Sequence, residues 1–409
     1  MSALPAGRFA AFRHRPFALY WSSRFFATFA AQILSVAVGW QVYDLTRDPL
    51  DLGLIGLVQF APSLLLVLVT GAVADRFGRR LIMGTAIGVE ALCALAILLL
   101  TLRGIGGVGP IFAILLVFGV ARAFMAPASA SLVANLVPPD TFANAVAWNS
   151  SAWQTATIVG PVAGGLLYGL SATTAYSCAT LLMVVAAVLI FLVPKPPQRI
   201  VTERPTFEAL FAGFRYIWRE KVVLGAISLD LFAVLLSGAT ALLPIYARDI
   251  LVLGPWGLGL LRAAPGVGAI LVAVWLAGHP LRDHAGRILL VFVALFGVST
   301  VVFGLSTVAW LSIVALALVG ATDMVSVYIR ETLLQLWTPD EVRGRVNAVN
   351  MVFLGASNEL GEFRAGTMAA LIGTVPAVVF GGVGAVAVAG LWGWLFPEMR
   401  RIRHLHGRH

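Results

Sequence analysis

The chain has 409 residues, of which 60% are hydrophobic and 11% are charged, and its formal net charge at pH 7 is +9. Soluble globular domains carry about 25% charged residues, so this composition excludes a soluble protein and predicts an integral membrane protein. The basic residues are spread over many short segments, which favours a topology signal and not a nucleic-acid partner.

Twelve apolar segments are long enough to cross a bilayer, which takes about 20 residues. In the first half they span 17–43, 52–74, 81–102, 109–133, 143–169 and 172–193. In the second half they span 222–247, 256–278, 286–306, 308–331, 345–372 and 375–396. We therefore predict an all-α protein with a six-helix bundle at 1–193, a polar inter-bundle loop at 194–221, and a second six-helix bundle at 222–409.

The arginines and lysines are distributed unequally between alternate loops. With the amino terminus inside, 20 of them fall in cytoplasmic segments, and the outer loops hold only Arg47, Arg103 and Arg248. Loops rich in Lys and Arg remain on the cytoplasmic side. The sequence therefore predicts a multi-pass protein of the cytoplasmic (inner) membrane with both termini in the cytoplasm.

The turn after the second predicted helix reads GAVADRFGRR from residue 71 to residue 80. It resembles the G-x-x-x-D-R-x-G-R-R/K loop of the major facilitator superfamily, and the resemblance extends over essentially the whole chain. It implies a secondary transporter in which this loop holds helix ends together during gating. The alternative is a solvated topology signal only. The residues concerned are Gly71, Asp75, Arg76, Gly78, Arg79 and Arg80.

A second string lies in the fifth predicted helix, at Gly160, Pro161, Gly164 and Gly165. It resembles the G-P-x-x-G-G core of the family's antiporter signature and implies export, although Ala156 replaces a glycine of that pattern. The resemblance also implies packing against the eighth helix, where Pro265, Gly266 and Gly268 form a matching run. Such a run could seal the two bundles, or could be ordinary close packing.

Three further strings, at 39–46, 343–346 and 357–363, resemble the enterobactin-exporter-like branch of the family. That branch continues with Glu and Ser after position 363, whereas this chain has Arg364 and Ala365. The two halves also resemble each other, because NLVPPD at 135–140 recurs as QLWTPD at 335–340. A parallel repeat of this kind places the substrate near the membrane midplane, between the halves.

Charged residues inside the membrane cost roughly 2.5–3.5 kcal/mol each, so each one needs a reason. By resemblance, helices 1, 4, 7 and 10 line the cavity, with Arg122 at the position of a basic residue that drug–proton antiporters keep. We hypothesise that Asp230 or Asp323 carries the proton and that Arg122 modulates it. The alternative is a set of static ion pairs. The embedded charges are Arg24, Glu90, Arg122, Asp230, Asp323, Glu359, Glu362 and Arg364.

Glu359 and Glu362 are three residues apart and share a helix face, so they could bind a cationic substrate or a proton. The alternative is a satisfied polar patch, and Glu90 is expected to have a structural partner. Some aromatic and amide side chains could contact the substrate, although Trp40, Tyr43 and Trp148 could also be interface anchors. The possible contacts are Trp40, Tyr43, Trp148, Trp153, Gln154, Tyr328, Asn350 and Asn358.

These observations predict a transporter that exports a small amphipathic compound, a drug-like molecule or a siderophore, by proton antiport and alternating access. The alternative is an importer or uniporter of the same fold. All six histidines lie in predicted loops or tails, and there is no nucleotide-binding string, so we expect no metal, no cofactor and no enzyme activity. The expected partners are the substrate, protons and the lipid bilayer, and we expect a monomer driven by the proton gradient.

Overall fold

The computed structural model describes residues 8–66, 69, 70, 73, 77–104, 107–133, 135–195, 207–279, 281 and 284–401. These residues form helices and no strands. The long helices of the first half are α1 (Arg15–Thr46), α2 (Pro49–Leu65), α4 (Arg79–Leu102), α5 (Gly109–Val133), α6 (Phe142–Leu170) and α7 (Ala172–Leu192). Those of the second half are α8 (Phe207–Arg219), α9 (Lys221–Ser237), α11 (Gly254–Gly278), α12 (Ala285–Leu305), α13 (Ala309–Trp337), α14 (Asp340–Ile372) and α15 (Thr374–Leu395).

Each of the twelve expected spans overlaps a helix of the described residues. Eight of the helical segments are long and apolar enough to cross a membrane by length and composition. The α2 helix and the apolar part of α5 are shorter, and α6 and α14 carry more polar side chains. The all-helical membrane fold is thus confirmed, and the number of twelve crossings stays a prediction.

Three expected boundaries differ from the structure. The tenth span, expected to end at residue 331, continues as α13 to Trp337, and the eleventh begins five residues earlier, at Asp340. The seventh span is interrupted, because α9 ends at Ser237 and is followed by the short elements η2 (Thr240–Leu242), α10 (Leu243–Ile245) and the π-turn η3 (Tyr246–Ile250). Pro244 prevents a continuous α-helix here, because it has no N–H to donate to the carbonyl of Thr240 and its ring clashes with that carbonyl.

The chain divides into two compact units, Met1–Thr46 with Val58–Arg204, and Arg47–Leu57 with Pro205–His409. The first turns of α2 therefore belong with the second unit. There Gly53 lies against Phe363 and Gly366 of α14, so close that a side chain at Gly53 would be 3.1 Å from both backbones. The stretch 194–221, predicted to be a loop, contains the helix α8. The hydroxyl of Tyr216 in α8 donates to the carbonyl of Trp337.

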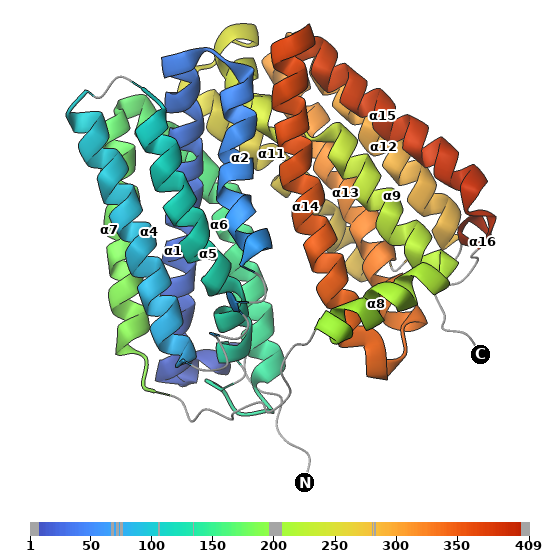
Figure 1. The fold of residues 1–409 in the computed structure, drawn as a ribbon, viewed down its shortest axis with the longest axis horizontal. Coiled ribbons are helices and arrows are strands. Elements are labelled where there is room, and N and C mark those ends of the chain that lie inside the picture. The colour runs from blue at the N-terminus through green and yellow to red at the C-terminus, as the bar shows by residue number, and fades with distance from the viewer. Residues whose placement is uncertain are drawn as a thin grey trace. The chain divides into compact units, whose positions relative to one another are not determined.

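The two units repeat the same helix packing, each within itself (Figure 1). In the first unit α1 packs on α6 and α7, and α4 packs on α5 and α7. In the second unit α9 packs on α14 and α15, and α12 packs on α13 and α15. These are the same pairs in the same order along the chain, which confirms the two pseudo-symmetric bundles expected from the sequence.

Two glycines mark equivalent close crossings. A side chain at Gly119 of α5 would overlap the carbonyl of Gln59 in α2, and one at Gly320 of α13 would overlap the carbonyl of Pro265 in α11. Small residues at such crossings allow helix backbones to approach closely, and the van der Waals contacts formed there favour helix association in lipid. Gly119 and Gly320 are 201 residues apart, which is also the separation of Arg122 and Asp323.

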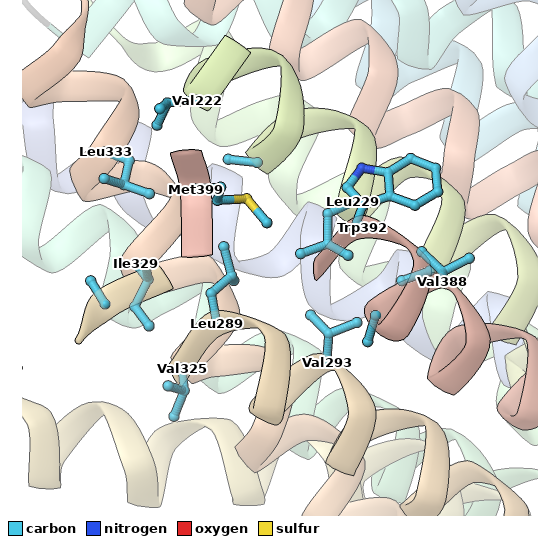
Figure 2. Close-up of a cluster of buried hydrophobic side chains, with 14 of the residues drawn as sticks. Val222, Leu229, Leu289, Val293, Val325, Ile329, Leu333, Val388, Trp392 and Met399 are labelled. Carbon is cyan, nitrogen blue, oxygen red and sulfur yellow. The ribbon is translucent and has the colours of Figure 1, made fainter. Parts of the chain in front are cut away.

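The core of the second unit is a cluster of buried apolar side chains contributed by α9, α11, α12, α13 and α15 (Figure 2). Leu229, Leu289 and Ile329 lie in it, and the indole nitrogen of Trp392 donates to the hydroxyl of Ser228 at 3.0 Å. The short helix α16 (Pro397–Arg400) is attached to this core through Met399, which is fully buried. The cluster therefore fixes the end of the chain's described part to the bundle.

Candidate functional site

A buried ion pair joins α9 to α13 in the second unit. The carboxylate of Asp230 contacts the guanidinium of Arg330, and the two side chains are 10% and 2% exposed. Both residues lie in helices long and apolar enough to span the membrane. A buried charge that loses its partner is strongly unfavourable, so the two residues must be considered together.

Two more acids interact with this ion pair. Asp323 is seven residues, or two helical turns, before Arg330 on α13, and it interacts electrostatically with both Asp230 and Arg330. Glu331 interacts with Asp230 and accepts a hydrogen bond of 3.2 Å from the amide of Asn350 on α14. We call Asp230, Asp323, Arg330, Glu331 and Asn350 the ion cluster.

The first unit has a contact at the equivalent position. Arg24 is the tenth residue of α1, as Asp230 is of α9, and its guanidinium donates to the hydroxyl of Ser129 on α5. It also donates to the hydroxyl of Tyr20 at 3.1 Å. Ser129 precedes Arg330 by the same 201 residues that separate the two glycines at the helix crossings. At this equivalent position the first unit has a base, Arg24, bound by hydroxyl groups. The second unit has an acid, Asp230, bound by a base.

Arg122 and Glu90 interact within the first unit. Arg122 of α5 is exposed, and its charge acts on Glu90 of α4, which is only 1% exposed. Among the described residues, neither carboxylate oxygen of Glu90 has a hydrogen-bond partner. The structural partner expected for Glu90 is therefore a charge at some distance and not a hydrogen bond.

Glu359 and Glu362 lie together, as their spacing predicts. A side chain at Gly56 of α2 would overlap the carboxylate of Glu359 and would approach that of Glu362 to 3.3 Å. Arg262 of α11 interacts electrostatically with Glu362. Arg364 has a different role, because its Nε donates to the carbonyl of Leu235 at 3.0 Å, near the end of α9.

Of the predicted gating residues, Gly71, Asp75 and Arg76 lie outside the described residues. Gly78 is the N-cap of α4, and Arg79 is its first residue. The guanidinium of Arg80 donates to the carbonyl of Val193 at 2.6 Å, which connects the start of α4 to the end of α7. This contact within one bundle was not evident from the sequence.

The glycines of the antiporter-like string pack within their own bundle. Gly160 lies against Gln32 of α1, and a side chain at Gly164 would be 3.0 Å from the Cα of Ile33. Pro161 and Gly165 are also buried. In the second unit the Pro265–Gly268 run packs on α13 in the same way. Ordinary close packing thus accounts for both runs, and a seal between the bundles stays a prediction.

The expected substrate contacts differ widely in exposure. Trp40 and Tyr43 are buried, and Asn350 is bound to Glu331 in the ion cluster. Trp153 is 51% exposed, whereas Asn358 is exposed but donates to the carbonyl of Leu354 in its own helix. Gln154 and Tyr328 are half-buried, and the indole of Trp148 donates to the carbonyl of Arg8.

Sequence reasoning missed Arg330, Glu331 and Arg262 as site residues. Arg330 and Glu331 were at the expected end of a span, where a charge needs no partner. The signal that could have revealed them is Asp230, because a membrane-embedded acid requires a nearby base. The extension of α13 to Trp337 places both residues well inside the helix.

Comparison with known proteins identifies relatives along nearly the whole chain. A family model described as "Transmembrane secretion effector" matches residues 6–401. The chain is 27% identical over 408 residues to the enterobactin exporter EntS of Citrobacter koseri, covering 95% of this chain and 94% of that protein. It is likewise 27% identical over 405 residues to EntS of Escherichia coli O1:K1, with the same coverage.

Solved structures share the fold at low sequence identity. A bacterial homologue of the human lysosomal transporter Spinster, in an inward-facing and occupied conformation, has a TM-score of 0.72 at 13% identity, covering 98% of this chain and 100% of that one. A POT family transporter in complex with a thioalcohol-conjugated peptide has a TM-score of 0.73 at 12% identity, covering 94% and 96%. These similarities establish the fold.

Proposed function

We propose that this chain, which belongs to the transmembrane secretion effector family of major facilitator transporters, exports a small amphipathic compound across the cytoplasmic membrane in exchange for protons. The family makes it a multi-pass membrane transporter and not an enzyme. Export, proton coupling, cytoplasmic termini and a monomeric state are parts of the proposal.

The direction of transport is supported by the relatives. The description of the matching family names secretion, and the curated relatives are named as exporters of enterobactin, a siderophore. At 27% identity the substrate can differ, so the proposal keeps two substrate classes, siderophores and drug-like amphipathic molecules. The antiporter-like string around Gly160 and Pro161 favours the same direction.

The observation that carries proton coupling is the composition of the ion cluster. Arg330 can balance one carboxylate, and Asp230 is in direct contact with it. Asp323 lies close enough to interact with both but is not their contact partner. The three acids of the cluster outnumber its one base, and Glu331 already accepts a hydrogen bond from Asn350. Excess negative charge at membrane depth is costly, and binding a proton reduces it. We therefore assign the transported proton to Asp323 and a charge-balancing role to Asp230 and Arg330.

This assignment explains how a proton can change the conformation. When Asp323 is charged, it competes with Asp230 for the guanidinium of Arg330, and when it is neutral, Arg330 pairs with Asp230 alone. The side chains come from α9 and α13, so the competition acts on the packing of these two helices. A ligand shifts a conformational equilibrium only through such a difference in interaction between states.

The test uses everted membrane vesicles energised by respiration, with a pH-sensitive dye that reports the proton gradient. Cationic, neutral and catecholate compounds are added to vesicles with wild-type protein, with Asp323→Asn, or with Asp249→Asn. Asp249 is the matched control, because it forms an exposed ion pair with Arg47 at 3.3 Å. A transported compound should dissipate the gradient with wild type and Asp249→Asn, and not with Asp323→Asn.

Binding of the same compound to purified Asp323→Asn should persist, which separates coupling from recognition. If Asp323→Asn dissipates the gradient as wild type does, the assignment of the proton to Asp323 is wrong. If whole cells that contain the protein accumulate more labelled compound than cells that lack it, the proposed direction is wrong and the chain is an importer.

A further inference from the structure

Three arginines converge on one hollow at the end of the second bundle. Arg287 is the third residue of α12, and Arg400 and Arg401 lie at the end of α16. Together with Leu290 and Val291 they line a hollow of about 470 Å³. These five residues are separate from the ion cluster and from the Glu359–Glu362 pair, and none of the proposed transport steps uses them.

The fold holds the three arginines in place. Met399 is fully buried in the core of the second bundle beside Val222, Leu289 and Leu333 (Figure 2). Gly286 lets the carbonyl of Met399 lie directly against α12, where any side chain would overlap it. The residues that follow Met399 are therefore fixed next to the first turn of α12. The hollow is thus built by buried contacts and does not depend on a free tail.

The arginines of this hollow have no counter-charge in the described part of the chain. All three are exposed, and none forms an ion pair with an acid among the described residues. The nearest acid along the chain, Glu398, lies 3.9 Å from Lys221. Converging positive charges without partners attract an anion, and the planar guanidinium matches the oxygens of a phosphate.

One wall of the hollow is apolar. Val291 is 54% exposed, and Leu290 beside it is half-buried, one turn beyond Arg287 on a helix long enough to span the membrane. A site that passes from guanidinium groups to exposed aliphatic side chains along a membrane helix fits a ligand with a phosphate head and an acyl chain. The arginine count predicts that this end of the bundle is cytoplasmic, where anionic lipids attract basic residues.

We propose that Arg287, Arg400 and Arg401 form a binding site for the headgroup of an anionic phospholipid of the cytoplasmic leaflet. The phosphate lies between the guanidinium groups, and an acyl chain follows Leu290 and Val291. A bound lipid neutralises the repulsion between the three arginines. It thereby stabilises the attachment of α16 to α12, independently of the substrate that the transporter carries.

The test is native mass spectrometry of the purified full-length protein in a non-ionic detergent, titrated with dioleoylphosphatidylglycerol or with dioleoylphosphatidylcholine. Wild type should retain phosphatidylglycerol in preference to phosphatidylcholine. The triple variant R287Q/R400Q/R401Q should bind phosphatidylglycerol at least about tenfold more weakly than wild type. The matched control R13Q/R15Q/R345Q removes three exposed arginines elsewhere and should bind as wild type does.

Two outcomes would overturn the proposal. One is equal phosphatidylglycerol binding by the triple variant R287Q/R400Q/R401Q and the control. The other is displacement of the lipid by inorganic phosphate at equal concentration, which would mean a site for free anions. The variant R287K/R400K/R401K keeps the charge and guards against misfolding, and it should bind phosphatidylglycerol between wild type and the glutamine variant.

Discussion

Arg24 and Asp230 occupy the same position in their respective bundles and carry opposite charges. Each is the tenth residue of a first helix, and each contacts the fourth helix of its own bundle, Arg24 at Ser129 and Asp230 at Arg330. The hydroxyl of Ser129 solvates Arg24 without cancelling its charge, whereas Arg330 cancels the charge of Asp230. The repeat has thus kept one contact between helices and changed its electrostatics.

Loss of Arg330 should destabilise the protein more than loss of any exposed arginine. Arg330→Gln leaves Asp230 buried without its partner, which costs about 3–5 kcal/mol. Arg47→Gln removes the base of an exposed pair, with side chains 50% and 40% exposed, and should cost only about 0–1 kcal/mol. Thermal unfolding in detergent checks both. The double variant D230N/R330Q should recover part of the loss, and no recovery would contradict a direct interaction.

Gly320 should be intolerant of the smallest side chain. Its backbone lies against the carbonyl of Pro265, so Gly320→Ala forces α11 and α13 apart at a cost of about 1–3 kcal/mol. Gly390→Ala, in α15 of the same unit, has no atom within 4 Å of the new methyl group. That control should be neutral or more stable, because alanine favours helix over glycine by up to about 1 kcal/mol. Equal unfolding temperatures for the two variants would refute the close crossing.

Replacement of Glu90 by an apolar side chain of similar volume should not destabilise the protein. Its carboxylate is buried without a hydrogen bond among the described residues, so Glu90→Met should stabilise the fold by about 1–3 kcal/mol. Glu398→Met, at an exposed site, serves as the control and should change little. A lower unfolding temperature of Glu90→Met would show instead that its charge is needed by Arg122.

Arg364 should protect the interrupted end of α9. Its Nε donates to the carbonyl of Leu235, two residues before α9 ends. Arg364→Gln loses a charged hydrogen bond worth about 1.5–3 kcal/mol. Hydrogen–deuterium exchange should therefore become faster in peptides that cover 234–242, while α12 keeps its wild-type exchange. Unchanged exchange at the end of α9 would show that Arg364 does not protect this segment.

Much of the fold could be predicted from the sequence because it depends on local composition. Runs of apolar residues located the helices, and the recurring hexapeptide at 135–140 and 335–340 revealed the repeat. The break after Ser237 was missed, although Gly238 follows it directly and Pro244 lies a few residues beyond. Hydropathy does not detect such a break, because both sides of it are equally apolar.

The candidate site was predicted only in part. The spacing of Glu359 and Glu362 placed them on one face correctly, because helical periodicity fixes that relation. Arg330 was missed because its partner Asp230 is 100 residues away, and no local pattern joins them. Glu90 was expected to have a partner, but a residue's own helix does not determine which neighbours reach its side chain.

The sequence by itself determined that this protein is a helical membrane protein, because burying apolar runs and excluding charged loops from lipid are properties of single segments. The major facilitator type followed from the resemblance of its motifs, above all the loop at 71–80. Only the tertiary structure decided which charges are balanced. Asp230 has Arg330, Arg24 has hydroxyls, and three arginines meet at the start of α12. Those outcomes depend on distances of a few ångströms between helices far apart in the chain, and at membrane depth such distances decide whether a charge is stable.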